Sequence, residues 1–165
     1  MKRNFVKIIG GMVLAFLVIS ALTFGLVFAQ GESKTQNGGG LEGTWDLQVT
    51  RRVCQTGAAI ATFASIETFM SGGTMLDSTS AGSPAFQTPG HGVWSNINQF
   101  NFRFRFKAFQ FDASGNFTGW IIVSHQPNLN RRTDEFESAG TSEFYNAQGV
   151  LLFTGCSTLT ATRFE

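Results

Sequence analysis

The residues of this chain that could carry chemistry include a run in which aromatic and cationic side chains alternate. The stretch 100–111 reads FNFRFRFKAFQF, so phenylalanine occupies half of its positions. Successive side chains of a β-strand point to opposite faces. The pattern therefore places Phe100, Phe102, Phe104 and Phe106 on one face, where they could line an apolar ligand cavity, and the cations on the other face.

Other residue types that could do chemistry are few. The chain has two histidines, His91 and His125, and their spacing matches no metal-ligand motif. We expect both to lie on the surface or to cap loops. The sequence contains neither a catalytic-serine motif nor a phosphate-binding loop. It therefore predicts no catalytic residue, no metal and no cofactor, and it favours a binding protein over an enzyme.

The first 29 residues have the features of an export signal. Lys2, Arg3 and Lys7 precede an uncharged apolar run over residues 8–29 that ends in Val-Phe-Ala. This pattern predicts a signal peptide cleaved after Ala29, and a periplasmic or extracellular protein. The alternative is an uncleaved anchor, because a run of 22 apolar residues could span a bilayer. We expect contact with the membrane only through this segment, if it is uncleaved.

The remainder of the chain reads as a tether followed by one domain. Residues 30–40 are polar and glycine-rich, which predicts a flexible linker. Residues 41–165 are long enough for a single domain with its own core. Without the three leader cations the chain has nine basic and eleven acidic residues. This balance gives no support to a nucleic-acid surface, and we expect no nucleic-acid partner.

The domain shows the period-two pattern of β-strands and little helical periodicity. A bulge near Ala108 would bring Phe109 and Phe111 to the face of the other phenylalanines. Eight strands in succession with one apolar face can close on themselves. We therefore predict an all-β fold, an eight-stranded antiparallel up-and-down barrel, with an open sandwich as the alternative. The predicted strands are 44–54, 64–70, 74–79, 92–97, 100–111, 117–125, 133–145 and 150–164.

Closure of such a barrel makes the first and last strands antiparallel neighbours. Paired residues then have a nearly constant sum of residue numbers, which is 208 for Trp45 with Arg163 and 210 for Cys54 with Cys156. By strand parity the first pair faces inward and the cysteines face outward. An oxidising compartment favours pairing of exported cysteines. We therefore predict a disulfide between Cys54 and Cys156 across the barrel seam.

The start and end of the domain resemble the lipocalin or calycin signature. Gly43-Thr44-Trp45 opens the first predicted strand, and Arg163 stands near the end of the last one. In that superfamily, the arginine packs on the tryptophan and closes the base of an eight-stranded barrel, a contact that gains cation–π attraction. The closer likeness is to helix-poor calycin-like barrels of exported bacterial proteins. The resemblance implies a small apolar ligand inside the barrel.

The interior of the predicted barrel has two interpretations. The inward phenylalanines could fill it, because an eight-stranded barrel is only just wide enough for its own side chains, or they could line a pocket. Arg51 shares the face of Trp45 and lies ~20 Å along the strand from it, where it could hold an anionic head group. Alternatively, Arg51 pairs with an acid at a strand end, or the strand bends before it. The loop 80–91 could act as a lid or be an ordinary surface loop.

We therefore expect an exported barrel that binds a small apolar or amphipathic ligand. One alternative is a filled barrel that acts through its outer face, where Arg103, Arg105 and Lys107 stand in line, although such a charge run is usually a solvated face. The other is a cyclase-like barrel enzyme. That reading needs an inward carboxylate or histidine, and the sequence pattern assigns none.

Overall fold

The computed structural model describes residues 40–165, so the predicted signal peptide and all but the last residue of the predicted linker lie outside the described residues. Within the described range the chain forms nine β-strands and no helix, and hence no helix able to cross a membrane. The strands are β1 (Gly43–Arg52), β2 (Ala59–Phe69), β3 (Thr74–Thr79), β4 (Gly90–Asn96), β5 (Phe102–Phe111), β6 (Phe117–His125), β7 (Asn128–Asn130), β8 (Glu135–Asn146) and β9 (Leu151–Arg163).

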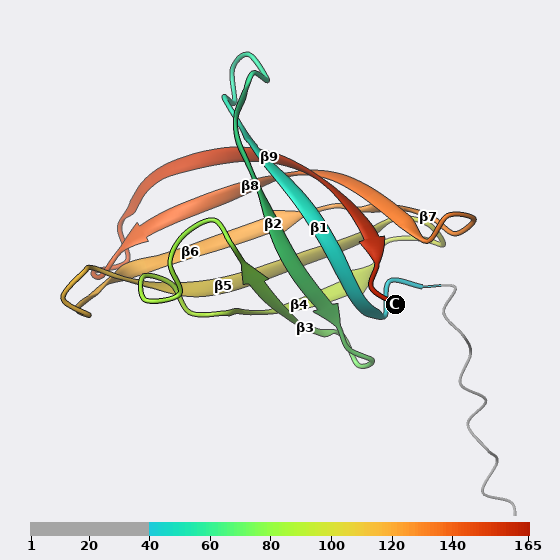
Figure 1. The fold of residues 1–165 in the computed structure, drawn as a ribbon, viewed down its shortest axis with the longest axis horizontal. Helices are drawn as coiled ribbons and strands as arrows, with labels where there is room; N and C mark the ends of the chain where they lie inside the picture. Colours follow the sequence, from blue (N-terminus) through green and yellow to red (C-terminus); the bar gives the residue numbers. More distant parts are fainter. Residues whose placement is uncertain (1–39) are drawn as a thin grey trace, which may run out of the picture. The chain divides into compact units, whose positions relative to one another are not determined.

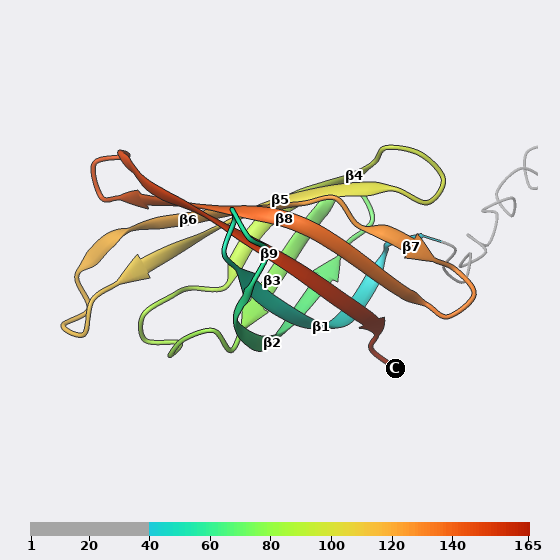
Figure 2. The same ribbon diagram turned by 90° about the horizontal axis from the view of Figure 1, so that it is seen from above.

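Eight of these strands form a closed antiparallel barrel, which confirms the predicted fold class. Strands β1 to β6 pair in sequence order, β1 also pairs with β9, and β9 pairs with β8. A pairing between β6 and β8 completes the ring, as the two views of the ribbon show (Figures 1 and 2). Strand β7 is a short addition that pairs with β8, and its Asn128 also forms an isolated bridge with Asn101.

Strands β2 and β7 differ most from the predicted set. Strand β2 begins at Ala59 rather than at residue 64, because its first residues pair with the end of β1, where Arg51 lies opposite Ala61. Residues 59–63 read AIATF and show no apolar–polar alternation. Their backbone hydrogen bonds to β1 make them part of the strand, and the sequence pattern gave no sign of this. Strand β7 has three residues, which is too short for a periodic pattern.

The phenylalanine-rich strand β5 faces inward in part. Phe102, Phe104 and Phe106 are buried. Phe100 lies before the strand and is 45% exposed, so its expected place on the inner face is wrong. The cause is a turn in which the side chain of Asn98 accepts the backbone N–H of Phe100 at 3.1 Å. The ring of Phe100 lies instead beside the guanidinium of Arg131, 5.4 Å from its centroid.

The predicted bulge near Ala108 is also wrong. Alternation continues through Ala108, which is buried, so Phe109 faces outward and is 46% exposed. Its ring packs against Phe117, with centroids 5.8 Å apart, and against the ammonium of Lys107. The register irregularity occurs later, between Gln110 and Phe111. Ala108 thus points into the barrel, and the inward–outward alternation of β5 continues through the position where the sequence pattern suggested a bulge.

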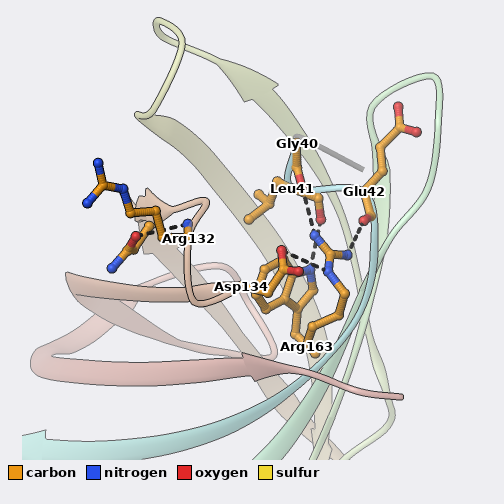
Figure 3. A network of polar contacts seen from close by, with 8 residues as sticks. Gly40, Leu41, Glu42, Arg132, Asp134 and Arg163 are labelled. Atoms are coloured by element: carbon orange, nitrogen blue, oxygen red, sulfur yellow. Dashed lines mark hydrogen bonds and ion pairs between the residues drawn. The ribbon is translucent and has the colours of Figure 1, made fainter. Parts of the chain in front are cut away.

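The base of the barrel is closed by Trp45 and Arg163, which face each other across the β1–β9 seam. The guanidinium carbon of Arg163 lies 4.3 Å from the centroid of the fully buried indole. Arg163 also donates to the carbonyls of Glu42 and Gly40 at 2.7 and 3.1 Å (Figure 3). Its Nε lies 3.3 Å from the carboxylate of Asp134. Four contacts thus converge at this end of the barrel through the side chain of Arg163, namely the cation–π stack on the indole, two hydrogen bonds to backbone carbonyls and one ion pair.

The backbone conformation and the close contact with Arg163 explain why glycine occupies position 43 of the Gly-x-Trp sequence. Gly43 has a φ of +117°, a conformation that other residues rarely adopt. A Cβ at this position would also come within 2.7 Å of Nη1 of Arg163. The indole Nε1 of Trp45 donates to the carbonyl of Leu41 at 2.8 Å, so the turn before β1 is held against the base.

A core of buried side chains fills the base half of the barrel. The aromatic rings of Trp45 and Phe136 have centroids 4.8 Å apart, and Phe69 packs against Phe104 at 5.5 Å. The buried cluster consists of Leu41, Trp45, Leu47, Phe69, Met75, Phe102, Phe104, Phe106, Leu129, Phe136, Leu159 and Ala161.

The predicted disulfide is confirmed. Cys54 follows the end of β1, Cys156 lies on β9, and their Cα atoms are 5.2 Å apart. The bridge joins residues separated by 102 positions, so it links the two strands that close the ring. Cross-links over long loops reduce the entropy of the unfolded chain.

We expect removal of the bridge to destabilise the barrel. The double variant C54S/C156S should lose ~2–4 kcal/mol of unfolding free energy, because its unfolded chain is less restricted. Urea titration under non-reducing conditions measures this loss. Reductant should lower the wild-type protein to the level of the variant and leave the variant unchanged. Equal stabilities of the oxidised wild type and the variant would contradict the expectation.

Candidate functional site

The barrel contains a cavity of about 250 Å³ at the end away from Trp45. Its lining includes Val49 and Arg51, which follow Trp45 along β1, and residues of the loop between β3 and β4. The barrel is thus filled at its base and open inside its other half. The apolar part of the lining is Val49, Phe63, Ala81, Phe86, Phe106, Ile121, Val123, Phe144 and Leu159.

The predicted ligand-binding residues occupy different places. Phe106 lines the cavity, whereas Phe102 and Phe104 belong to the core beneath it. Arg51 stands at the rim, exposed, with its guanidinium carbon 5.5 Å from the centroid of Phe63. No carboxylate within residues 40–165 lies at ion-pair distance from Arg51.

Two carboxyl groups face the cavity from neighbouring strands. Glu67 on β2 and Asp77 on β3 are paired in register, and each is 3% exposed. The hydroxyl of Ser65 donates to Oδ1 of Asp77 at 2.7 Å. Oε2 of Glu67 is buried and has no hydrogen-bond partner among the described residues. Since buried polar atoms are nearly always paired, this oxygen is a candidate contact for a bound molecule.

Burial changes the acidity of both carboxyl groups. It raises the pKa of Asp77 from 3.8 to about 6, and the Ser65 hydrogen bond opposes this rise. Burial also raises the pKa of Glu67 well above its ordinary value, and the nearby charge of Asp77 adds to the effect. Glu67 therefore holds its proton more strongly than an exposed glutamate does, while Asp77 ionises near pH 6.

A buried histidine lies in the same interior. His125 ends β6 and is 3% exposed. Its Nδ1 is 3.1 Å from the hydroxyl oxygen of Ser138, and its Nε2 is 3.0 Å from that of Ser157. The ring stacks on Phe104 with centroids 5.4 Å apart. Gly140 leaves room for it, because a Cβ there would come within 2.5 Å of the imidazole.

The expectation that both histidines lie on the surface or cap loops is therefore wrong for His125. Strand β6 continues through this residue, and its alternation puts His125 on the inner face with Ile121 and Val123. Burial lowers the pKa of His125 to about 4, so the imidazole is neutral at ordinary pH. His91, in contrast, is exposed.

The acidic pair and the histidine come from opposite sides of the ring. Around the ring of eight strands, β6 is four strands away from β2 in both directions, so the two strands lie opposite each other. Glu67 and His125 both line the cavity between them. The cavity floor thus offers two carboxyl groups on one side and a neutral imidazole with hydroxyls on the other. It can donate and accept hydrogen bonds and can exchange protons.

Sequence reasoning missed this polar floor, although a signal was present. Glu67 shares strand parity with Phe69, and Asp77 with Met75, and both of these partners are in the core. An acid on the apolar parity of a strand is unusual. No group of three metal-ligating side chains close enough to hold an ion occurs in the described part of the chain.

Comparison with known proteins gives no relative. No family model matches the chain, and no curated protein and no solved structure matches it either. The closed eight-stranded barrel is consistent with a calycin-like fold. The residues of the cavity are therefore interpreted from their own geometry.

We expect Asp77→Asn to stabilise the protein at pH 7.5 and to have little effect at pH 4. The folded protein holds the Asp77 proton up to about pH 6 and the unfolded chain releases it near 3.8, so stability falls as pH rises between these values. Raising the pKa by this amount corresponds to at most ~3 kcal/mol. Urea titrations of wild type and variant at both pH values measure the difference.

His125 has the opposite pH dependence, because its lowered pKa makes stability rise with pH from about 4 to 6.5. The wild type and the Asp77→Asn variant share this contribution of His125, so it cancels when their unfolding free energies are compared. A variant that is equally or less stable than the wild type at pH 7.5 would show that Asp77 is not buried as an ionised group.

Proposed function

We propose that this barrel binds a small, mostly apolar molecule that carries a polar group. The observation that supports it best is an apolar cavity whose floor holds Glu67, with a buried oxygen that no described residue satisfies. Ligand sites are typically apolar pockets with a few polar groups that fix orientation. A bound molecule would supply the missing partner of Glu67.

The volume of the cavity limits the ligand. Drug-sized sites have ~300–1,000 Å³, whereas this cavity has about 250 Å³. An apolar cavity of ~150 Å³ accepts benzene. The size therefore suits a substituted aromatic ring or a short chain and is too small for a long-chain lipid.

The roles of the lining residues follow from their places. Phe106 would form a wall, Phe102 and Phe104 would support the floor, and Arg51 would contact the outer end of the ligand at the rim. The loop between β3 and β4 contributes Phe86 and neighbouring residues to the lining, so it would cover the entrance. Trp45 and Arg163 would keep the base closed.

Membership of the lipocalin and calycin group and export belong to the same proposal. The Gly-x-Trp start of β1, the Arg163 contact and the closed ring support the first. The Cys54–Cys156 disulfide supports an oxidising compartment. The apolar leader remains a prediction from sequence.

A second candidate function is proton transfer on a bound carbonyl compound, and the inward Asp77 and Glu67 favour it. Ionised Asp77 could take a proton from the carbon next to the carbonyl and return it to another carbon of the same substrate. Protonated Glu67 could donate a hydrogen bond to the carbonyl oxygen during this step. Such a reaction is an isomerisation without any net change of atoms or charge.

We expect a side chain that fills the cavity to abolish ligand binding. Ser142 lines the cavity on β8, and its neighbour Thr141 is exposed. Ser142→Phe should weaken binding of toluene, p-cresol and 2-phenylethanol at least tenfold, whereas Thr141→Phe should leave it unchanged. NMR titration measures the affinities, and circular dichroism checks that both variants fold. Equal binding by both variants, or none by the wild type, would refute the proposed function.

The second candidate makes a separate prediction. A panel of small enolisable ketones incubated with the protein in D₂O should gain deuterium next to the carbonyl faster than in buffer. Asp77→Asn should remove this acceleration, because the amide cannot accept the proton, while Thr141→Phe should retain it. Mass spectrometry measures the incorporation. Rates equal to those in buffer for every ketone would leave binding as the function.

A further inference from the structure

The described part of the chain supplies no counter-charge to the acidic groups of the cavity floor. Four charged or titratable side chains line the cavity, namely Arg51, Glu67, Asp77 and His125. His125 is held between two hydroxyls and its lowered pKa keeps it neutral. Only Arg51 is cationic, and it stands at the rim.

Arg51 is too far along its strand to neutralise the acids. Glu67 lies opposite Trp45 in the β1–β2 register, whereas Arg51 lies opposite Ala61. Six residues of strand separate Trp45 from Arg51, which corresponds to ~20 Å. The guanidinium of Arg51 is instead placed beside the ring of Phe63.

The other cation near the level of Glu67 is already engaged. Arg163 lies opposite Trp45 on the far side of β1. It forms an ion pair with Asp134 and donates to two backbone carbonyls at the base. Strands β4, β5, β8 and β9 contribute no charged side chain to the cavity lining.

We propose that the ligand carries a protonated amine, which binds between Glu67 and Asp77 while its apolar body lies among the aromatic and aliphatic walls. An ammonium group has three donors. They match the unpaired Oε2 of Glu67 and the carboxylate of Asp77, of which one oxygen already accepts from Ser65. Phe106 and Phe144, both in the lining, can add cation–π attraction.

This inference rests on the proposed function and narrows it to one class of ligand. An ammonium group supplies the positive charge that the buried acids lack, and charge-assisted hydrogen bonds are the stronger kind. A ligand with a carboxylate would instead meet like charge at the floor, since Asp77 is ionised above about pH 6. The role of Arg51 as an anion anchor is therefore not needed for binding at the floor.

The test compares three ligands of one shape by isothermal titration calorimetry on the full chain. At pH 7.5, 2-phenylethylamine should bind at least tenfold more tightly than 2-phenylethanol, and 3-phenylpropionate most weakly. From pH 7.5 to 5 the amine should lose at least fivefold in affinity, because Asp77 takes up a proton while the amine keeps its own. The alcohol should change little over this range.

Variants assign the effect to the acidic pair. Asp77→Asn and Glu67→Gln keep the shape of each side chain. Asp77→Asn should reduce amine binding at least tenfold without weakening alcohol binding, and Glu67→Gln should reduce amine binding less, because the raised pKa of Glu67 favours its neutral form. Asp46→Asn is the matched control, because it removes the same charge from an exposed side chain of β1.

The possible results separate the two proposals. If the alcohol or toluene binds but the amine has no advantage, or if Asp46→Asn reduces amine binding as much as Asp77→Asn does, the inference is wrong and the proposed function stands. If neither the neutral compounds nor the amine binds, the proposed function and the inference are both wrong.

Discussion

The pairing of β1 with β9 is the contact on which the rest of the structure depends. It makes the sheet a ring, so one face of every strand becomes interior and the other exterior. A closed ring also leaves no unpaired edge among the barrel strands. The disulfide between Cys54 and Cys156 fixes this seam covalently at one end, and the stack of Arg163 on Trp45 fixes it at the other.

Closure divides the interior into a packed half and an open half. Large aromatic side chains fill the base, where Phe69, Phe104 and Phe136 surround the indole. Toward the other end the inward positions include Ser65, Ser142 and Ser157, whose small side chains leave space. Glu67, Asp77 and His125 lie where these halves meet. This polar floor above an aromatic core is where the barrel could bind or react with a ligand, because each of the three groups is buried and each has an altered pKa.

Much of the fold could be predicted from the sequence, because it depends on local alternation and on one long-range register. The strand pattern, the β1–β9 neighbours and the disulfide all follow from parity and residue numbering. The misplaced phenylalanines have local causes. The turn at Asn98 ends the regular pairing before Phe100, so this residue lies outside the strand. Phe109 faces outward because the alternation of the strand continues through Ala108, which takes the inward position although its side chain is small.

The polar floor was harder to predict, because it requires the register of strands that are distant in sequence. That Glu67 faces Asp77 depends on the β2–β3 pairing, and that His125 lies across the cavity from them depends on the number of strands in the closed ring. Residue type alone suggested a surface or loop position for His125, and it gave no reason to place Glu67 or Asp77 inside, since Asp, Glu and His are usually exposed.

The central claim is that closure buries Glu67 and Asp77 side by side inside the barrel. Carbon-13 NMR of the side-chain carboxyl groups, followed from pH 3 to pH 9, tests it most directly. The account predicts that the Asp77 carboxyl titrates near pH 6 and that the pKa of Glu67 lies well above its ordinary value. Titration of both groups near pH 4, as for exposed carboxyl groups, would contradict it.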